Sequence, residues 1–235
     1  MAPGDSPILF KHTLQVDKVK KIIGIPGTFQ SDICMYLSSV MTNLGMSVII
    51  CDLSGDGRMM DCIPRPAANL DVVSYRGVDF CDGFPMHTDR EYNCEIWVMN
   101  ENPDQKLIRA CDEIYMVSGC ERHQIENARG YMMDSHVPMN VVIRNICPGT
   151  DGAHGFFGRI EQENAFVLEE YSLPMDPIDE SYRIKMQYGT FDEFRELSKA
   201  FGRLITKMTT QITEVSNFEV HKAFALARKG VMLCV

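Results

Sequence analysis

The chain has 235 residues, of which 45% are hydrophobic and 23% are charged, and its formal net charge is −9. This composition is typical of one globular domain with a large core, and it leaves too little chain for two such domains. The acidic balance, without an extended basic run, argues against nucleic acid as a direct partner.

Membrane and export signals are absent from the sequence pattern. No apolar stretch reaches the ~18 residues of a membrane span, and residues 1–10 lack the charged and apolar regions of a signal peptide. We therefore expect a cytoplasmic protein. The nine cysteines include no CxxC pair. Free, buried thiols in a reducing compartment account for them, and a metal site is the alternative.

Residues 20–52 predict a βαβ unit, around which the rest of the chain is organised. A β-branched run at residues 22–25 indicates a buried strand, and a Pro-Gly pair ends it. A second apolar strand ends at Asp52. We expect the two strands to lie parallel and side by side. The turn after the first strand is the place where such folds hold phosphate.

A helix connects these two strands. Ser31 and Asp32 are good N-cap residues, apolar residues follow with a period of 3.6, and Gly45 stands where a helix ends. The helix is therefore expected to turn one apolar stripe towards the sheet. The stripe consists of Ile33, Tyr36, Leu37, Val40, Met41 and Leu44.

This unit resembles the first βαβ unit of the ParA/MinD-type ATPases, whose deviant P-loop reads roughly K-G-G-x-G-K-[ST]-[ST]. Leu37, Gly45 and Asp52 match later positions of the family pattern without a gap. The resemblance spans roughly residues 20–215. It implies an α/β fold of the P-loop NTPase type, with a mostly parallel, twisted sheet of about seven strands and helices on both faces.

The aligned loop has lost the side chains that hold phosphate. The family's first lysine falls on Ile25, its phosphate-binding lysine on Gln30, and the glycine before that on Phe29. Only Gly27 and Ser31 keep the pattern. A P-loop needs glycines so that the backbone approaches the phosphates, and a lysine to neutralise them. Losing both cations should therefore weaken binding and, more strongly, catalysis.

Two further motifs are eroded in the same direction. In the family's D-x-D-x-x-G strand end, Asp52 and Gly57 survive, but the second aspartate falls on Ser54. The Walker B aspartate falls on Asn100, ahead of a matching Pro103. An amide supplies no negative charge for a magnesium site. Asp52 is therefore at most a catalytic remnant, and the alternative is a strand-end cap.

The resemblance implies a residual nucleotide site at the carboxyl ends of the strands. Asn145 matches a family asparagine that reads the adenine edge, and the alternative for it is a strand-end turn residue. The residual cofactor-binding set is Gly27, Thr28, Gln30, Ser31, Asp32 and Asn145. Ser31 and Asp52 are the candidate Mg²⁺ ligands. We expect that no cofactor is required and that ATP and Mg²⁺ bind weakly.

The remaining pattern divides the chain into a lead-in at residues 1–19, an α/β domain at 20–217 and a tail at 218–235. The tail predicts a short helix that packs on the domain rather than on a membrane. Residues 76–93 are expected to be irregular. Further strands are predicted at residues 70–75, 95–99, 110–117, 141–145 and 165–168, and helices at 121–133 and 190–215.

Three functions fit this pattern. The first is a catalytically impaired ParA/MinD-like scaffold, most similar to the TadZ/CpaE branch, which positions pilus or secretion machinery at a cell pole; it implies protein partners and a homodimer that needs no nucleotide. The second is an unusual ATPase whose cation comes from elsewhere, with Lys20 and Lys21 as the nearest lysines upstream. The third is an α/β domain that binds another small ligand at the same strand ends. Its crevice would be lined by Asp52, Asn100, Glu101 and Asn145.

Overall fold

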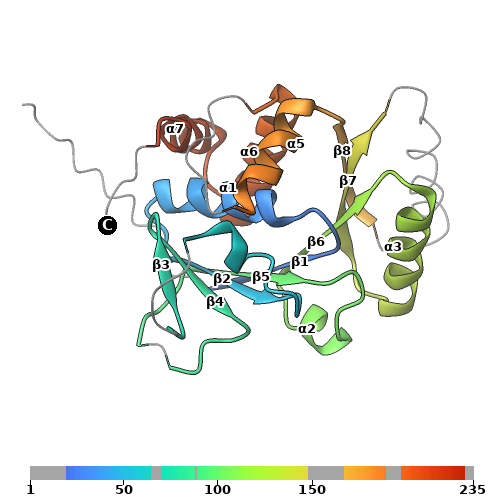
Figure 1. Cartoon of the computed structure of the whole chain (residues 1–235), viewed down its shortest axis with the longest axis horizontal. Helices are drawn as coiled ribbons and strands as arrows, with labels where there is room; N and C mark the ends of the chain where they lie inside the picture. Colours follow the sequence, from blue (N-terminus) through green and yellow to red (C-terminus); the bar gives the residue numbers. More distant parts are fainter. Residues whose placement is uncertain (1–19, 65–69, 88, 148–166, 189–196, 231–235) are drawn as a thin grey trace, which may run out of the picture.

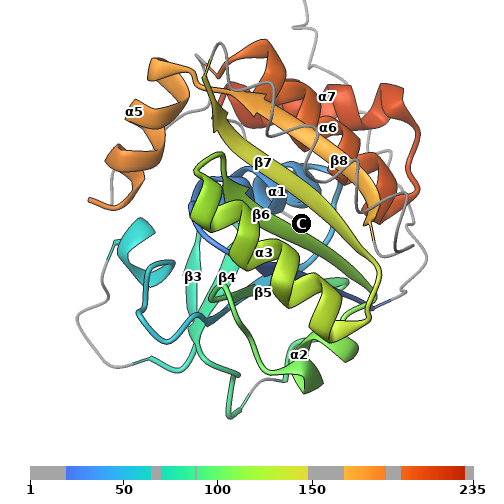
Figure 2. The same ribbon diagram turned by 90° about the vertical axis from the view of Figure 1, so that its right-hand side faces the viewer.

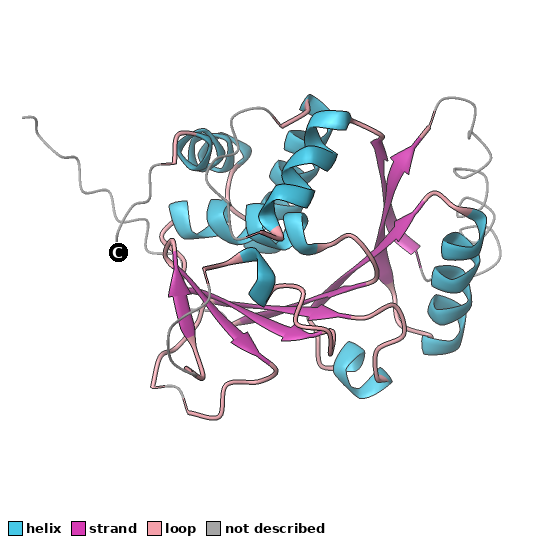
Figure 3. Ribbon diagram, in the orientation of Figure 1, coloured by secondary structure: helices cyan, strands magenta, loops and turns pink. Residues whose placement is uncertain are grey.

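A single eight-stranded sheet runs through the protein, with helices on both of its faces (Figures 1 and 3). The computed structural model describes residues 20–64, 70–87, 89–147, 167–188 and 197–230. The strand order is β3-β4-β2-β5-β1-β6-β7-β8. Every neighbouring pair is parallel except β3 and β4. The predicted α/β class with a mostly parallel sheet is therefore confirmed.

The strands have these bounds: β1 Lys21–Pro26, β2 Val48–Leu53, β3 Val73–Tyr75, β4 Val78–Asp82, β5 Cys94–Met99, β6 Glu113–Gly119, β7 Met139–Ile146 and β8 Val167–Pro174. The prediction that the second strand lies beside the first is wrong, because β5 lies between β1 and β2 and pairs with both. The connection through the helix skips one position in the sheet and leaves room for the later strand.

The segment predicted to be irregular contains a central strand. β4 pairs in parallel with β2 and is buried over four of its five residues. It is joined to β3 by a two-residue turn in which Arg76 and Gly77 both have positive φ angles, 50° and 73°. Such a turn suits a hairpin, but an arginine at its first position gives no turn signal in the sequence.

The helices have these bounds: α1 Ser31–Asn43, η1 Met60–Cys62, α2 Gln105–Arg109, α3 Arg122–Ser135, α5 Pro177–Met186, α6 Lys199–Thr213 and α7 Asn217–Arg228. Two apolar clusters lie on opposite faces of the sheet: one includes buried residues of α1, α6 and α7, the other those of α2 and α3. Figure 1 shows this separation of the helices. The sequence pattern did not predict α2 or α5.

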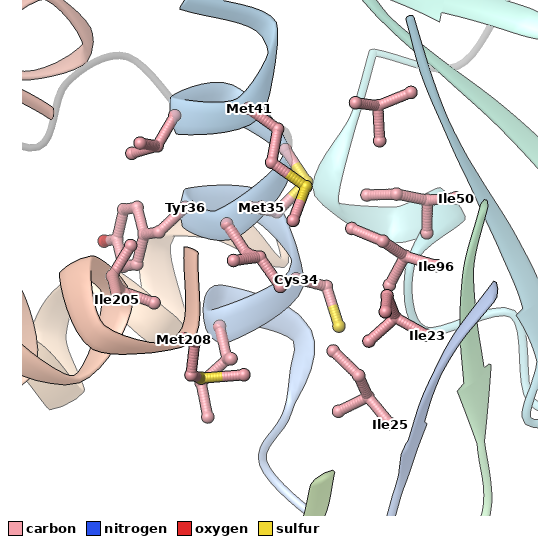
Figure 4. Packing of buried hydrophobic residues seen from close by; sticks show 14 of the residues in the cluster. Ile23, Ile25, Cys34, Met35, Tyr36, Met41, Ile50, Ile96, Ile205 and Met208 are labelled. Atoms are coloured by element: carbon pink, nitrogen blue, oxygen red, sulfur yellow. The ribbon is translucent and has the colours of Figure 1, made fainter. Parts of the chain in front are cut away.

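α1 is buried on nearly all sides, so it carries more than the single stripe predicted from its periodicity. Figure 4 shows why: Cys34 and Met35 point towards the isoleucines of the sheet, whereas Tyr36 lies on the side of α6. The Tyr36 ring packs edge-on against Phe201 of α6, with 5.3 Å between centroids. Polar side chains inside the helix bond its own carbonyls, as Thr42 does to Ser38, so their burial leaves these donors satisfied.

α6 starts later than predicted. Ser198 accepts a hydrogen bond from the Phe201 N–H and caps the helix, which therefore begins at Lys199 and not at residue 190. The predicted apolar face is confirmed for Phe201, Leu204, Ile205 and Met208, all of which are buried. Phe191 and Phe194 lie outside the described residues, as do the lead-in at residues 1–19, Ala165 and Cys234.

The tail helix packs into the core, as predicted. α7 contributes Val220, Ala223 and Ala227 to the same cluster as α1 and α6, whereas its Phe218 is 79% exposed. Among the helices that the structure describes, none has the length and apolar character needed to cross a bilayer. The eight cysteines in the described part of the chain are free thiols, and five of them are buried.

Replacing Val220 by Ala should lower the free energy of unfolding by about 2 kcal/mol, because a fully buried side chain of α7 leaves the core. Urea titration measures this change. Phe218→Ala is the matched control on the same helix, where the side chain is exposed, and it should change stability by less than about 0.5 kcal/mol. Equal effects of the two substitutions would contradict the packed position of α7.

Candidate functional site

The loop after β1 is held between the ends of the neighbouring strands. The Gly27 N–H donates to the carbonyl oxygens of Met99 and Asn100, and the Thr28 N–H donates to Val117 O at 3.1 Å. Gly27 has a φ of 125°, and a Cβ on it would lie 1.9 Å from Val117 O. Glycine is therefore required here by the close approach of two backbones.

Phe29 has a backbone conformation that glycine adopts more easily than other residues. Its φ is 57°, in the left-handed region that a bulky residue rarely occupies. Its ring packs under the Arg183 guanidinium, 4.8 Å from the centroid. The loop thus has a strained backbone at Phe29.

Gln30, which the resemblance aligns with the phosphate-binding lysine, is fully buried, and its side chain contacts other groups of the protein. Its Nε2 donates to Met99 O at 2.8 Å, and its Oε1 accepts from Arg58 Nη1 at 3.3 Å. The amide therefore ties the loop to β5 instead of facing a ligand.

Ser31 and Asp32 lie inside the first turn of α1, so their prediction as N-caps is wrong. Gln30 holds the N-cap position and makes no capping bond with its side chain. Ser31 is buried, and its side chain hydrogen-bonds the Cys62 thiol; burial of that thiol nevertheless raises its pKa to about 12.

Asp32 forms a buried ion pair with Arg144 of β7. Arg144 Nη1 donates to Asp32 Oδ1 at 2.5 Å and Nη2 to Oδ2 at 2.8 Å. The exposed fractions of the two side chains are 0% and 2%. Burial pulls the pKa of Arg144 down, but Asp32 and the hydrogen bonds outweigh that effect and raise it. The pair is bidentate, the strongest arrangement of these two groups.

Arg144 also binds the loop after β1. Its Nη1 donates to the Phe29 carbonyl oxygen, and Nη2 lies 3.5 Å from Glu180 of α5. The first turn of α1, the loop and α5 are therefore joined through one guanidinium. No sequence motif predicted a role for Arg144. The one available signal was its position, because it immediately precedes the predicted site residue Asn145.

Asn145 lies at an irregularity of β7, with a φ of 59° and a shift of register between Ile143 and Ile146. Its side chain lies close enough to Glu180 to help lower the pKa of that carboxyl. Its carbonyl oxygen accepts from the Cys120 thiol at 2.9 Å. The amide expected to read adenine therefore lies beside a carboxylate of α5.

Asp52 stabilises the loop that follows β2. Its Oδ1 accepts from the N–H and hydroxyl of Ser54, and its Oδ2 accepts from the Met59 N–H at 2.7 Å. It is 1% exposed. These contacts are those of a strand-end cap, the alternative reading of this residue.

The space beside the loop is small in this conformation. A cavity between the loop and the end of β6, lined among others by Gly27, Thr28 and Ser118, has a volume of ≈ 10 Å³, about that of one water. In the described part of the chain, no three His, Cys, Asp or Glu side chains are grouped to hold a metal ion. Asn100 is exposed and accepts from the Asn102 N–H.

Cations approach the loop from elements that sequence reasoning did not consider. Arg58, from the segment after β2, hydrogen-bonds Gln30 and forms a close ion pair with Asp56; its hydrogen bonds hold the pKa of Asp56 well below its usual range. Lys20 and Lys21 pair instead with Glu95 and Glu113 near the starts of β5 and β6. These are the amino ends of the strands, opposite to the ends where the loop lies. The upstream lysines therefore do not serve the loop.

Comparison with known proteins identifies the fold. No family model matches the sequence, and no curated protein does. Among solved structures, the MinD cell division protein of Aquifex aeolicus is similar, with a TM-score of 0.57, 14% identity, and coverage of 83% of this chain and 98% of that one. A putative plasmid partition protein of Borrelia burgdorferi, bound to AMPPNP, gives 0.54, 11%, 88% and 98%. The pNOB8 ParA bound to nonspecific DNA gives 0.53, 12%, 88% and 99%. These likenesses establish the ParA/MinD type of α/β fold.

Removing one partner of the buried pair should be strongly destabilising. Arg144→Met leaves the Asp32 carboxylate buried without its cation, and the expected loss is about 3–5 kcal/mol by urea unfolding. Adding Asp32→Leu in the same chain should recover most of that loss, because the carboxylate left without its cation is removed as well. Arg122→Met breaks an exposed pair with Glu126 and serves as the control, with a change below about 1 kcal/mol. A loss in Arg144→Met no larger than in this control would refute the role of the pair.

Glu180 should make stability depend on pH. Its burial raises the carboxyl pKa, but Arg183, Arg144 and Asn145 outweigh burial and hold it below 4.5. A lowered pKa in the folded state means that the stabilisation is complete above 4.5 and disappears as pH falls through the folded-state pKa. Wild type should therefore exceed Glu180→Gln in unfolding free energy at neutral pH, and the difference should shrink in acid. A difference that is constant with pH would count against this assignment.

Proposed function

We propose that this chain, which has the fold of the ParA and MinD ATPases, hydrolyses ATP poorly or not at all and acts as a localisation or assembly scaffold. The observation that carries the proposal is the buried Asp32–Arg144 pair at the start of α1, beside a loop whose lysine position holds Gln30. A negative side chain of the protein lies where the helix N-terminus would otherwise meet phosphate.

The charge of Asp32 opposes nucleotide binding in two ways. A helix N-terminus attracts an anion through its free N–H groups and its dipole, and the carboxylate already lies in the first turn. A triphosphate brought to the same place would compete with this carboxylate for the Arg144 guanidinium. Asp32, Phe29 and Glu180 already share that guanidinium, so the pair offers a phosphate no net positive charge.

The loop backbone supports the same conclusion. Two of its N–H groups, those of Gly27 and Thr28, bond strand carbonyls, whereas a P-loop works by turning successive N–H groups towards phosphate. Opening the loop for a nucleotide would break these bonds and expose buried Gln30. On this proposal, the strained backbone at Phe29 serves the structure of the loop and has no role in catalysis.

A scaffold needs the folded domain but does not need ATP hydrolysis. By its resemblance to the TadZ/CpaE branch, we propose protein partners in a pilus or secretion assembly, at a cell pole and in the cytoplasm. The net charge of −9 favours protein partners over nucleic acid. Because the family's first lysine is here Ile25, buried in the core, we propose that any homodimer forms without nucleotide.

One observation favours the runner-up, an unusual ATPase. Arg58 reaches the position of the missing lysine from another segment, and its Nη1 lies 3.3 Å from Gln30 Oε1. A guanidinium there is a phosphate-binding group of the right charge. It is, however, held by Asp56 through both carboxylate oxygens, and that pair would have to open.

Calorimetric titration of the protein with ATP and Mg²⁺, combined with a phosphate-release assay, tests the proposal. We expect a Kd of about 1 mM or weaker, no turnover, and sedimentation that nucleotide leaves unchanged. Phe29→Gly/Gln30→Lys should tighten binding about tenfold or more by restoring the glycine and the cation.

The decisive comparison uses Arg58→Ala, with Arg122→Ala as the matched exposed-arginine control. Turnover in wild type that Arg58→Ala abolishes and Arg122→Ala preserves would establish the ATPase and defeat the scaffold proposal. Tight, Mg²⁺-dependent ATP binding in wild type would defeat it as well.

A further inference from the structure

Three neighbouring strands are each followed at once by a residue that carries sulfur. β6, β7 and β8 lie side by side at one edge of the sheet and run parallel, as Figure 2 shows. The first residues after these strands are Cys120, Cys147 and Met175. The carboxyl ends of parallel strands meet on one side of the fold, which is where α/β proteins hold their ligands. The topology therefore brings two thiols and a thioether to one place.

The sulfur atoms are in contact with one another or with a shared oxygen. Cys147 Sγ lies 3.8 Å from Met175 Sδ. It also lies 3.6 Å from the carbonyl oxygen of Asn145, which accepts a hydrogen bond from Cys120 Sγ at 2.9 Å. These contacts form where β7 departs from regular pairing, since Asn145 has a φ of 59° and the register with β8 shifts there. The end of β7 therefore links the sulfur atoms of its two neighbouring strands.

The spacing of the sulfur atoms suits a single metal ion. A sulfur ligand lies ~2.3 Å from a bound ion, and two such ligands at a tetrahedral or trigonal angle are about 3.8–4.0 Å apart. The distance from Cys147 Sγ to Met175 Sδ has this value without any rearrangement. Cys120 joins them as a thiolate, because loss of its proton frees the sulfur from the Asn145 oxygen.

The donor types select a soft, monovalent ion. Two thiolates and a thioether are ligands that Cu(I) prefers, whereas hard cations prefer oxygen. The neighbouring carboxylate of Asp176 is engaged, because it caps α5 by accepting from two of its N–H groups. Among the described residues, no three His, Cys, Asp or Glu side chains are close enough together for a zinc site. Cys120 and Cys147 are half-buried and Met175 is 55% exposed, so an ion can reach them from solvent.

We infer that Cys120, Cys147 and Met175 form a binding site for one Cu(I) ion. On binding, both thiols release their protons, and each of the three sulfur atoms donates an electron pair to copper. One positive ion replaces two protons, so the site gains a single negative charge, and no oxidant or reductant takes part. The inference is independent of the proposed scaffold function, because it requires neither a nucleotide nor a protein partner.

Competition with bicinchoninate, a chelator whose Cu(I) complex is coloured, tests this inference on the reduced full chain without oxygen. We expect one tightly held Cu(I) per chain and the release of two protons. Cys120→Ser and Cys147→Ser should each weaken binding at least about a hundredfold, since even residues that only orient a metal ligand contribute about 10- to 100-fold to affinity.

Cys111→Ser is the matched control for these variants. Cys111 is also a half-buried, free thiol, but it precedes β6 and therefore lies at the opposite end of that strand. Its replacement should change Cu(I) affinity by less than about twofold, because distant sites act independently.

Met175→Leu tests the thioether without disturbing the fold. The side chain is 55% exposed, and leucine has nearly the same volume. The variant should keep the wild-type free energy of unfolding, and its Cu(I) affinity should fall about tenfold. X-ray absorption should count three sulfur ligands around copper in wild type and two in this variant. A merely structural role for Met175 would leave that count unchanged.

Less than one Cu(I) per chain, or equal losses in Cys120→Ser and Cys111→Ser, would overturn the inference. So would Zn²⁺ that displaces Cu(I) at equal concentration, because the site is assigned to a soft ion. A wild-type copper centre with only two sulfur ligands would overturn the role of Met175. Unfolding curves of the serine variants without metal should stay close to that of wild type, so that loss of a ligand is distinguished from loss of the fold.

Discussion

A carboxylate and a guanidinium, both buried, meet at the start of α1, and much of the candidate site depends on their pairing. Removing such charges from water is costly, and the cost is met only when the two groups bond each other with good geometry. Asp32 and Arg144 do so through two hydrogen bonds. Because Arg144 also holds the Phe29 carbonyl and approaches Glu180, the loop, α1, β7 and α5 take one joint arrangement. In a nucleotide-binding loop, the anion comes from the ligand. Here it is part of the chain.

The positive charges near the loop come from other segments of the chain. Arg58, Arg144 and Arg183 come from three different segments and surround a loop that has none of its own. Each is already engaged, with Asp56, Asp32 or Glu180.

The elements that were predicted well are those in which one whole face is buried, because burial of a face gives their apolar residues a regular spacing in the sequence. The β-branched strands at the centre of the sheet and the long apolar face of α6 are examples. β4 was missed because two of its five residues are aspartates. Asp79 is buried with hydrogen bonds from Ser74, Arg90 and Tyr92, which lie outside its own strand. α1 was predicted as a one-sided helix, since its periodicity cannot reveal that α6 and α7 cover its outer side.

The sequence by itself determined the α/β class and the place of the loop after the first strand. These follow from local composition and spacing. Only the tertiary structure decided that β5 separates β1 from β2, that Gln30 faces inwards, and that Arg144 neutralises Asp32 from 112 residues away. Such pairings depend on which strands become neighbours, and the energy of a buried charge is set by those neighbours and not by its own segment.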